Sequence, residues 1–270
     1  MSAAALDHVG VVTRDLAATA SQYDRLGFTV APFAKSADGR IGNRCVMLRR
    51  GYIELMAVAD ASRGSATLDR FLARYAGIHI IALAIADEVS EVQRLARASI
   101  ESTAVSFERS VDESDNHAGI ARFQLIAAPE QPEGRINLVR HLTPELLWQE
   151  TLLAHANNAV ALDGVMVASA DPAETAARFC RIAGCSVVPD PTGGYALELR
   201  QGRVRLLADA ASHVLPRIVG LTLQTNDANA AIAHIVNKHG ISHRALSDAL
   251  VVDADEAGGA MLHFVGTPAA

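Results

Sequence analysis

The chain has 270 residues, of which 50% are hydrophobic and 20% are charged, and its formal net charge is −6. A chain of this length and apolar content can bury a large core, which excludes a disordered or low-complexity protein. Because the charge balance is acidic and the sequence has no block of Lys and Arg, we expect no nucleic-acid partner.

The sequence also bears on the compartment and on membrane association. No apolar run reaches the roughly 18 residues that a membrane span needs. The first residues show no basic segment followed by the apolar stretch of a secretory signal. Cys45, Cys180 and Cys185 form neither a metal-binding spacing nor an even disulfide set. We therefore expect a cytoplasmic protein with no membrane partner.

The first structural unit is predicted at the start of the chain. Residues 6–15 form an apolar run that ends in a charged turn. Residues 16–27 place apolar side chains on one helical face, with Asp15 as the N-cap and Gly27 at the end. Three strands are expected to follow, over residues 28–32, 44–50 and 52–58. The unit therefore has the order strand, helix, strand, strand, strand.

The same order of elements recurs along the chain. Residues 162–171 match residues 6–15 in the interval between a Leu-Asp pair and a closing Asp, and a helix is predicted over 173–183. Weaker copies begin at residues 78 and 218. Such self-similarity indicates repeated copies of one architecture. The remaining helices are predicted over 89–98 and 228–239, and the remaining strands over 107–109, 120–126, 135–141, 186–189, 194–200, 203–208, 242–246, 249–253 and 260–265.

These copies predict an α+β protein with four βαβββ modules arranged in two pairs. The joint between the pairs is expected within residues 151–159. The first domain then covers residues 1–150, a linker covers 151–158, and a second, degenerate domain covers 159–270.

The first module carries three distinctive sequences. They are Leu-Asp-His-Val-Gly-Val at 6–11, Leu-Gly-Phe-Thr-Val at 26–30 and Tyr-Ile-Glu-Leu at 52–55. With them the chain resembles the vicinal oxygen chelate superfamily, and its glyoxalase-like members in particular. The resemblance implies that each pair of modules forms a half-open barrel of mixed sheet with the helices outside. It also implies a divalent metal bound by the first and last strands of paired modules.

Two side chains of the first module are candidate metal ligands. By strand alternation His8 shares a face with Gly10, and Glu54 shares one with Tyr52. If both faces line the concave side, an imidazole and a carboxylate converge, a mixed donor set that suits Zn, Ni, Mn, Fe or Mg ions. Alternatively, Glu54 faces solvent or pairs with a neighbouring arginine.

The second module departs from the pattern of the superfamily. His79 lies in its opening strand, one residue out of step with His8, so that a bulge would turn it inward and a strict register would turn it away. Asn137 stands where many glyoxalase-like proteins have Glu. His141 shares the strand face of Asn137, and it either supplies the missing nitrogen, acts as acid or base, or caps the strand exit.

The second half has lost most of these groups. Gly164 and Gly220 stand at the places of the opening ligands, and Arg205 stands where Glu54 would be. His263 keeps a coordinating side chain. Two-domain extradiol dioxygenases resemble the four-module layout but place their iron in the second half, so we do not expect that activity here.

The favoured function is a metal-dependent lyase or isomerase of the glyoxalase or epimerase type. It would act on a small oxygenated substrate through a metal-stabilised enediolate. The predicted ligands are His8, Glu54 and His79, and the predicted proton carrier is Glu54 or His141.

The alternative is a metal-free protein that binds small molecules, like the drug-sequestering, bleomycin-resistance members of the superfamily. The replacement at Asn137 and the displaced His79 favour this alternative. In either case Asn137, Tyr52 and Trp148 are expected in the substrate pocket, although an aromatic residue such as Trp148 equally suits a core position at the barrel edge. A homodimer is a further expectation, because half-open barrels expose sheet edges.

Overall fold

The structure of the protein is a computed structural model that describes residues 4–112, 114, 119–208, 216–227, 231, 234, 240–246 and 249–266. The first half contains β1 (Ala5–Val12), α1 (Leu16–Arg25), β2 (Ala34–Lys35), β3 (Ile41–Met47), β4 (Tyr52–Val58), α2 (Ala66–Arg74), β5 (Gly77–Ala84), α3 (Glu88–Arg97), β6 (Thr103–Ser110), β7 (Ile120–Ala127) and β8 (Arg135–His141). Two short 3-10 helices follow, η1 (Pro144–Leu146) and η2 (Glu150–Leu152).

The second half repeats this order. It contains β9 (Ala159–Ser169), α4 (Pro172–Ala183), β10 (Ser186–Pro189), β11 (Tyr195–Glu198), β12 (Arg203–Ala208), β13 (Arg217–Thr225), β14 (His243–Ala245), β15 (Ala249–Val252), η4 (Ala254–Glu256) and β16 (Met261–Gly266). Most of the helix predicted over residues 228–239 lies outside the described residues.

The strands form two mixed sheets of eight strands each. Their orders are β2-β3-β4-β1-β5-β8-β7-β6 and β10-β11-β12-β9-β13-β16-β15-β14, so the two sheets have the same topology. In each sheet the first strands of two modules lie antiparallel at the centre, and each pairs in parallel with the last strand of its own module. The prediction of an α+β fold with paired βαβββ modules is confirmed.

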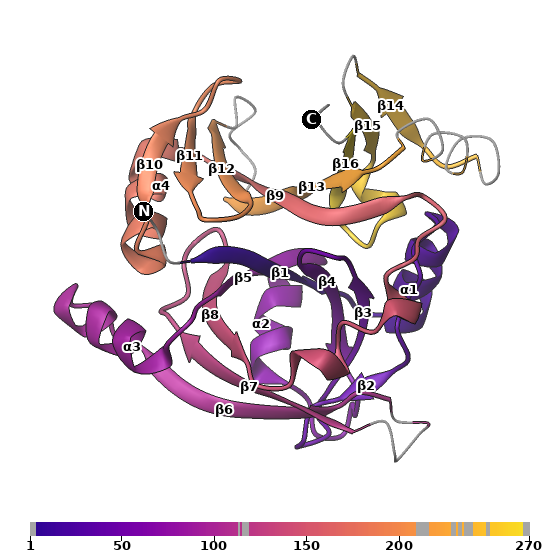
Figure 1. Cartoon of the computed structure of the whole chain (residues 1–270), viewed down its shortest axis with the longest axis horizontal. Helices are drawn as coiled ribbons and strands as arrows, with labels where there is room; N and C mark the ends of the chain where they lie inside the picture. The colour runs from indigo at the N-terminus through magenta and orange to yellow at the C-terminus, as the bar shows by residue number, and fades with distance from the viewer. Residues whose placement is uncertain are drawn as a thin grey trace.

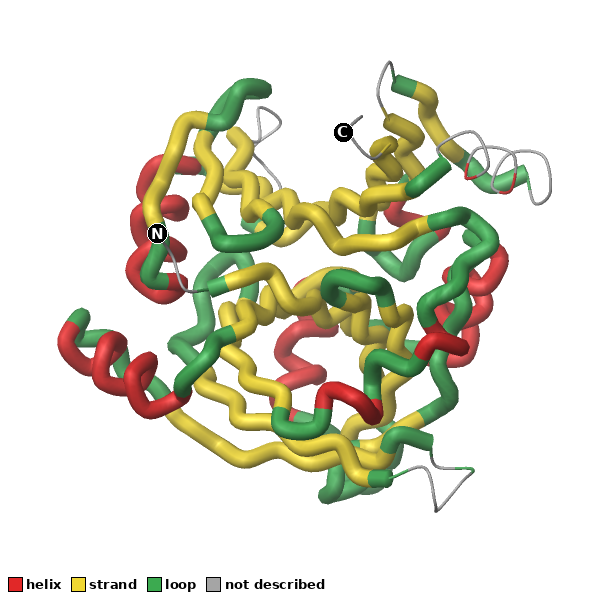
Figure 2. The backbone as a smooth tube through the Cα atoms, in the orientation of Figure 1, coloured by secondary structure: helices red, strands yellow, loops and turns green. Residues whose placement is uncertain are grey.

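The two sheets differ in curvature. The first sheet curls round until β2 meets β6, where Ser36 forms a backbone bridge with Arg109. This contact closes a barrel, whereas the second sheet spreads as an open cup above it (Figure 1). The secondary structure colouring shows the ring of strands and the two flanking groups of helices (Figure 2).

Helix α2 was not predicted, and it occupies the barrel rather than its outside. Ser65 caps it by accepting a hydrogen bond from the backbone N–H of Leu68. Leu68, Phe71 and Leu72 are buried on one face at helical spacing and pack against Ile80 of β5. The helix therefore plugs one part of the barrel and narrows the space inside it.

The strand predicted over residues 28–32 is absent, and β2 forms further along the chain instead. Gly27 ends the preceding helix at a positive φ of 87°. One backbone bond joins Ala31 to Cys45, and Pro32 has no N–H to continue the ladder. Pairing therefore begins at Ala34, which lies opposite Asn43.

A shared apolar core joins the two halves. Val9 and Val11 of β1 and Val165 and Val167 of β9 are buried in one cluster, together with Phe179 of α4. Strand alternation then leaves the intervening residues of β1 facing the interior of the barrel. The back-to-back packing of the two sheets thus fixes which side chains enter the first barrel.

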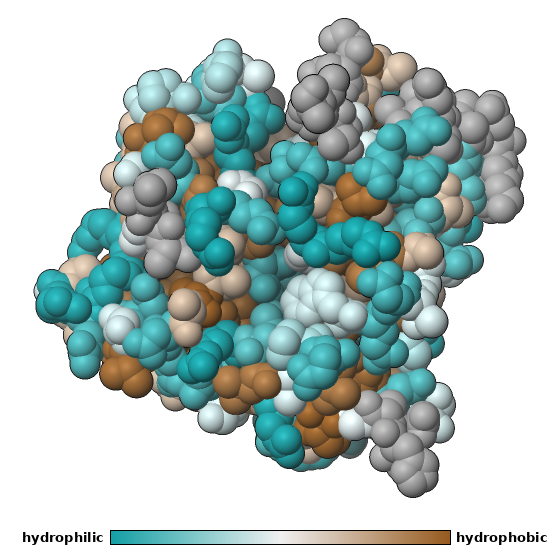
Figure 3. Space-filling view, in the orientation of Figure 1, coloured by the Kyte–Doolittle hydropathy of each residue, from teal (hydrophilic) through white to brown (hydrophobic). Residues whose placement is uncertain are grey.

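The surface shows no large apolar area in the orientation of Figure 3. Hydrophilic residues predominate on this face, and apolar residues are scattered among them. None of the described helices is long and apolar enough to cross a membrane.

Candidate metal and substrate site

A cavity of about 230 Å³ lies inside the first barrel. Tyr52 forms part of its wall. Among its polar lining residues are His8, Asn43, Glu54, Arg109, Arg135 and Asn137. Among its apolar lining residues are Ile41, Met56, Leu68, Ile80, Phe107 and Phe123. Four of the seven residues predicted for the site, His8, Glu54, Asn137 and Tyr52, therefore line one cavity.

The pairing of β1 with β4 brings His8 and Glu54 together. In this parallel pair His8 lies opposite Tyr52, and Gly10 lies opposite Glu54. The Tyr52 ring stacks on the His8 ring with centroids 4.3 Å apart. Nε2 of His8 lies 4.0 Å from Oε2 of Glu54, and Asn43 donates a hydrogen bond of 3.0 Å to Oε1 of Glu54. Glu54 faces the cavity and has no arginine within ion-pair distance among the described residues.

Asp7 is a member of the site that the sequence reasoning missed. Its Oδ1 atom accepts hydrogen bonds from Nδ1 of His8 at 2.6 Å and from Nε2 of His141 at 3.0 Å. Burial raises the pKa of Asp7, but the hydrogen bonds and positive charges of the two imidazoles outweigh this effect and hold the pKa at about 2. Because the carboxylate accepts the Nδ1 proton of His8, the ring is oriented with its Nε2 atom toward Glu54.

Strand alternation gave no reason to place Asp7 in the site of His8. Neighbouring residues of a regular strand point to opposite faces, so Asp7 and His8 were not expected to touch. The pairing of β1 with β5 shifts register between Leu6 and His8, and this irregularity lets both side chains reach one another.

His141 lies behind the cavity wall rather than in it. Its ring packs edge-on against Tyr52, Phe123 and Trp148, and Nε2 is held by Asp7. Ligand atoms of Asp7, His8 and His141 lie within 4.8 Å of one another, so this buried group is itself able to hold a metal ion. His141 is not among the residues that line the cavity, but it packs against two that do, Tyr52 and Phe123.

Trp148 is also placed behind Tyr52. Its Nε1–H donates to the carbonyl of Leu48 at 3.0 Å, and its ring packs edge-on against Tyr52 with centroids 5.8 Å apart. Trp148 is not among the residues that line the cavity. It supports the Tyr52 ring, which corresponds to the core role that its position also suggested.

The structure does not bring His79 to His8 and Glu54. Its ring is stacked between Tyr75, at 4.0 Å, and Phe71, at 4.7 Å, and Nε2 donates to the carbonyl of Tyr75 at 2.9 Å. The next residue, Ile80, lines the cavity instead. The pairing of β1 with β5 is irregular at this point, because Gly10 lies opposite Ile80 and Val11 lies opposite Ile78. This irregularity does not turn His79 into the cavity, since the ring is held between Tyr75 and Phe71.

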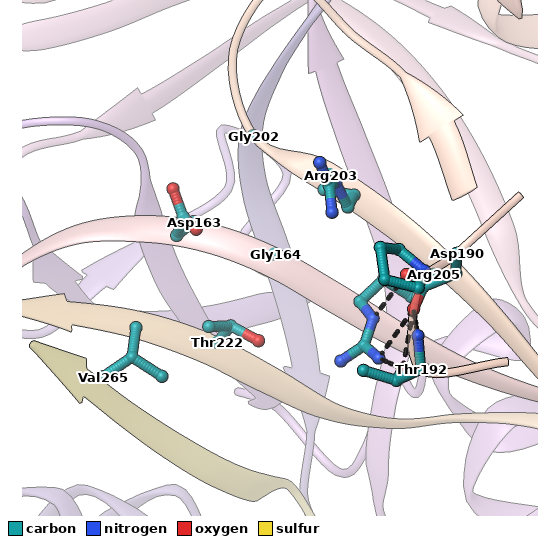
Figure 4. A pocket seen from close by; sticks show the side chains of 10 residues that line it. Asp163, Gly164, Asp190, Thr192, Gly202, Arg203, Arg205, Thr222 and Val265 are labelled. Atoms are coloured by element: carbon teal, nitrogen blue, oxygen red, sulfur yellow. Dashed lines mark hydrogen bonds and ion pairs between the residues drawn. The ribbon is translucent and has the colours of Figure 1, made fainter. Parts of the chain in front are cut away.

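The second sheet contains a larger hollow of about 460 Å³ with a different chemistry (Figure 4). Gly164 pairs with Arg203 as His8 pairs with Tyr52, and Arg205 takes the place of Glu54. Arg205 is bound by Asp190 through contacts of 2.8 and 3.1 Å. Among the described residues that line this hollow there is no histidine, so the first barrel carries the candidate chemistry.

Comparison with known families fits this geometry. The family model of the glyoxalase-like domain matches residues 6–183, which is about two thirds of the chain. The chain belongs to the glyoxalase-like family. This membership confirms the resemblance to the vicinal oxygen chelate superfamily that the first module suggested. No curated protein matches the sequence of this glyoxalase-like chain.

Solved structures share the fold of this glyoxalase-like protein at low identity. A hypothetical protein from Staphylococcus aureus is 12% identical with a TM-score of 0.74, covering 98% of this chain and 100% of its own. A mutant of 4-hydroxymandelate synthase from Streptomyces coelicolor is 10% identical with a TM-score of 0.64, covering 100% and 94%. A xylose isomerase-like TIM barrel/4-hydroxyphenylpyruvate dioxygenase fusion protein is 13% identical with a TM-score of 0.63, covering 98% of this chain and 49% of its own.

Proposed function

We propose that this glyoxalase-like protein is a metal-dependent lyase or isomerase that acts on a small oxygenated substrate in the first barrel. One observation carries the proposal. Nε2 of His8 and Oε2 of Glu54 lie 4.0 Å apart in the cavity wall, and Asp7 holds the opposite nitrogen of His8. A carboxylate behind a ligating histidine is the usual support of a metal site, because it fixes the tautomer and the ring orientation.

The donor set fits a divalent ion. His8 offers a nitrogen and Glu54 a carboxylate oxygen, while Oδ1 of Asn137 is buried and has no hydrogen-bond partner among the described residues. An unpaired buried carbonyl oxygen is costly and is satisfied by a bound cation. Mixed nitrogen and oxygen ligands suit Zn, Ni, Mn, Fe or Mg ions. We therefore assign His8, Glu54 and Asn137 as the residues that would hold the metal.

The same residues support proton transfer. A bound divalent ion supplies Lewis acidity toward a substrate carbonyl. Glu54 is the carboxylate in the cavity wall, so we assign it to accept a proton from the carbon next to that carbonyl and to return the proton to a neighbouring atom. Asn43 orients Glu54 through its hydrogen bond of 3.0 Å. His141 does not line the cavity, and it acts as a positioning residue through Asp7.

The second candidate is a metal-free binding protein of the same superfamily, and one observation favours it. In the second module Ile80 takes the wall position beside Gly10, and a Cβ added at Gly10 would lie 3.0 Å from Cβ of Ile80. An aliphatic side chain at this place removes a possible fourth ligand. The cavity would then hold its ligand by shape and by the polar groups of its wall.

Metal content separates the two candidates. The protein is purified without chelator and its metal is measured by mass spectrometry, in the wild type and in the variants His8→Ala, Glu54→Gln and His141→Gln. Glu108→Gln, which changes an exposed carboxylate of β6, is the matched control. We expect a stoichiometric divalent ion in the wild type, the control and His141→Gln, and its loss in His8→Ala and Glu54→Gln.

Two results would contradict the assignment. A wild type that neither contains nor takes up Zn²⁺, Mn²⁺ or Ni²⁺ supports the metal-free binding protein. Loss of metal in His141→Gln but not in Glu54→Gln would place the ion on Asp7, His8 and His141, behind the cavity.

We also propose that two copies of the chain associate. β10 and β14 are the edge strands of the open second sheet, and unpaired edges are sites of strand pairing between chains. Light scattering coupled to size-exclusion chromatography gives the mass in solution, and a monomer mass would contradict this proposal.

A further inference from the structure

Arg109 is a buried cation in the wall of the candidate site. It belongs to β6, where its backbone bridge to Ser36 closes the barrel, and the residue is 4% exposed. The guanidinium lies 5.7 Å from the centroid of the Phe123 ring. Arg109, Phe107 and Phe123 all line the cavity that contains His8. The charge therefore faces the same enclosed space as the proposed metal ligands.

The protein compensates this charge incompletely. Nη1 of Arg109 donates to Oδ1 of Asn43 at 3.2 Å, and Nη2 contacts Sγ of Cys45 at 3.4 Å. Both partners are neutral groups, and no carboxylate of the described residues lies within 4.0 Å of the guanidinium. An arginine has five N–H donors, and a buried charge without a partner is costly. The remaining donors are suited to an anion that enters the cavity.

The neighbouring groups do not remove this positive charge. Glu54 is reached only through Asn43, which links the two side chains by hydrogen bonds. Burial raises the pKa of Cys45 to about 11, against the opposing effect of Arg109, so the thiol stays neutral. If a divalent ion is bound, its charge exceeds that of Glu54, and Arg109 is left without a counter-charge.

The second arginine of the wall is different. Arg135 pairs with Glu130 at 3.3 Å, so its charge is already balanced by a carboxylate outside the cavity lining. Among the described residues of this wall, Arg109 is therefore the arginine with no carboxylate within ion-pair distance, although Glu54 acts on its charge from farther away.

We propose that Arg109 binds an oxyanion of the substrate, and that the substrate is a small organic acid. This inference rests on the proposed function and adds its substrate class. A guanidinium recognises a carboxylate or a phosphate through paired N–H donors. The cavity of about 230 Å³ is smaller than the pockets of roughly 300–1,000 Å³ that hold drug-sized ligands. The aromatic and aliphatic wall around Arg109 suits a short carbon skeleton beside the anionic group.

Calorimetric titration tests the proposal with probes of matched shape. Pyruvate carries a carboxylate next to a carbonyl, methyl pyruvate is its neutral ester, and inorganic phosphate represents the other oxyanion. Each is titrated into the wild type, Arg109→Met, Arg109→Lys and the control Arg122→Met, with and without added Mn²⁺ and with a chelator in the metal-free series. Arg122 is an exposed arginine of the adjacent strand, and it pairs with Glu108.

We expect pyruvate to bind the wild type and Arg122→Met equally. Arg109→Met should weaken pyruvate binding at least about tenfold, which corresponds to the loss of a charge-assisted hydrogen bond, and Arg109→Lys should restore part of it. Methyl pyruvate should bind all four proteins weakly. Phosphate that binds more tightly than pyruvate and depends on Arg109 would identify a phosphorylated substrate rather than a free carboxylic acid.

Two outcomes overturn the proposal. Equal binding of the acid and its ester to the wild type excludes recognition of the anion, and this comparison does not depend on the folding of any variant. Unchanged pyruvate binding in Arg109→Met excludes Arg109 as its site. The metal measurement is independent, because Arg109→Met should keep the metal that His8→Ala loses. Arg109-dependent binding in a protein without metal would contradict the proposed function alone.

Discussion

The carboxylate of Asp7 connects two imidazoles that come from opposite ends of the first domain. It accepts a hydrogen bond from His8 on β1 and another from His141 at the end of β8. Buried carboxylates require such partners, since an isolated charge in the interior is strongly unfavourable. Asp7 therefore both depends on the two histidines and fixes the ring of His8 in the orientation that the proposed metal site uses.

Replacing Asp7 with Asn tests this support. The amide keeps the shape of the side chain but loses the charge that holds the Nδ1 proton of His8, so metal affinity should fall about 10–100-fold. Competition with a chelating dye measures the change. The control is Asp163→Asn, at the equivalent place in the second half, where the carboxylate accepts from Gln224. Equal affinity in Asp7→Asn and the control would contradict a supporting role for Asp7.

His79 is not placed as a metal ligand, but its burial is expected to make the stability of the protein depend on pH. Burial lowers its pKa to about 4, the hydrogen bond to the Tyr75 carbonyl and the charge of Glu130 oppose the shift, and Arg74 adds to it. The Nδ1 atom is buried without a hydrogen-bond partner among the described residues, so the folded protein disfavours a proton there. The unfolded chain binds that proton at about pH 6.5.

Stability should therefore decrease as the pH falls from about 6.5 toward about 4, by an amount on the order of 2 kcal/mol. The sign follows because the unfolded state binds more protons than the folded state in this interval. Urea unfolding across the interval measures the loss. In His79→Gln, whose amide can still donate to the Tyr75 carbonyl, the pH dependence should be shallower. An identical slope in the wild type and the variant would exclude His79 as its source.

At the scale of elements, α4 is attached to the first barrel through a buried ion pair. Glu133, in the segment before β8, has a side chain that is 2% exposed. Arg178 of α4 donates to both of its oxygens at 3.0 Å, and the hydroxyl of Thr175 donates to Oε1 at 3.0 Å. Two helical positions of the second half thus bind one carboxylate of the first.

Replacing Glu133 with Gln should lower the free energy of unfolding by about 1–3 kcal/mol, because charge-assisted bonds are replaced by neutral ones in a buried place. The midpoint of urea unfolding reports the change. Glu150→Gln is the control, since the Arg49–Glu150 pair is exposed and its loss should change stability by less than about 0.5 kcal/mol. Similar effects of both substitutions would show that the Glu133 pair contributes no more than a surface pair.

On the scale of the whole molecule, the two sheets do not have separate cores on their facing sides. Val9 and Val11 of the first sheet are buried in the same apolar cluster as Val165 and Val167 of the second. Full burial of such a side chain contributes roughly 1.5–3 kcal/mol. Backbone hydrogen bonds cross the same layer, from Leu162 to Arg50 at 2.9 Å and from Leu6 to Gln201 at 2.8 Å.

The full chain should consequently unfold in one cooperative transition, and residues 1–158 expressed alone should expose the apolar face of β1. Calorimetry of the full chain and binding of a hydrophobic dye to the fragment measure these properties. Two resolved transitions, or a fragment that unfolds cooperatively without binding dye, would show that the first domain is independent of the second. The boundaries 1–150 and 159–270 remain a prediction until that measurement is made.

The order of modules was predictable from the sequence because its signals are local. Asp15 caps α1, and the Leu-Asp to Asp spacing repeats where β1 and β9 end. Strand alternation likewise grouped His8 with Gly10 and Glu54 with Tyr52, since period-two patterning needs no knowledge of the partner strand, but it left the inward direction of these faces open. The strand predicted over 28–32 does not form. Pro32 is a local signal against it, because proline has no N–H for the backbone ladder.

The tertiary structure decided the remaining parts of the candidate site. The approach of His141 to Asp7 depends on a register shift and joins residues that are 134 positions apart. The direction of His79 depends on an irregularity in the pairing of β1 with β5 and on the rings of Phe71 and Tyr75 that hold it. Arg109 enters the site because the sheet curls until β6 meets β2. Such contacts follow from strand register and sheet curvature, which long-range packing fixes and no local pattern of side chains records.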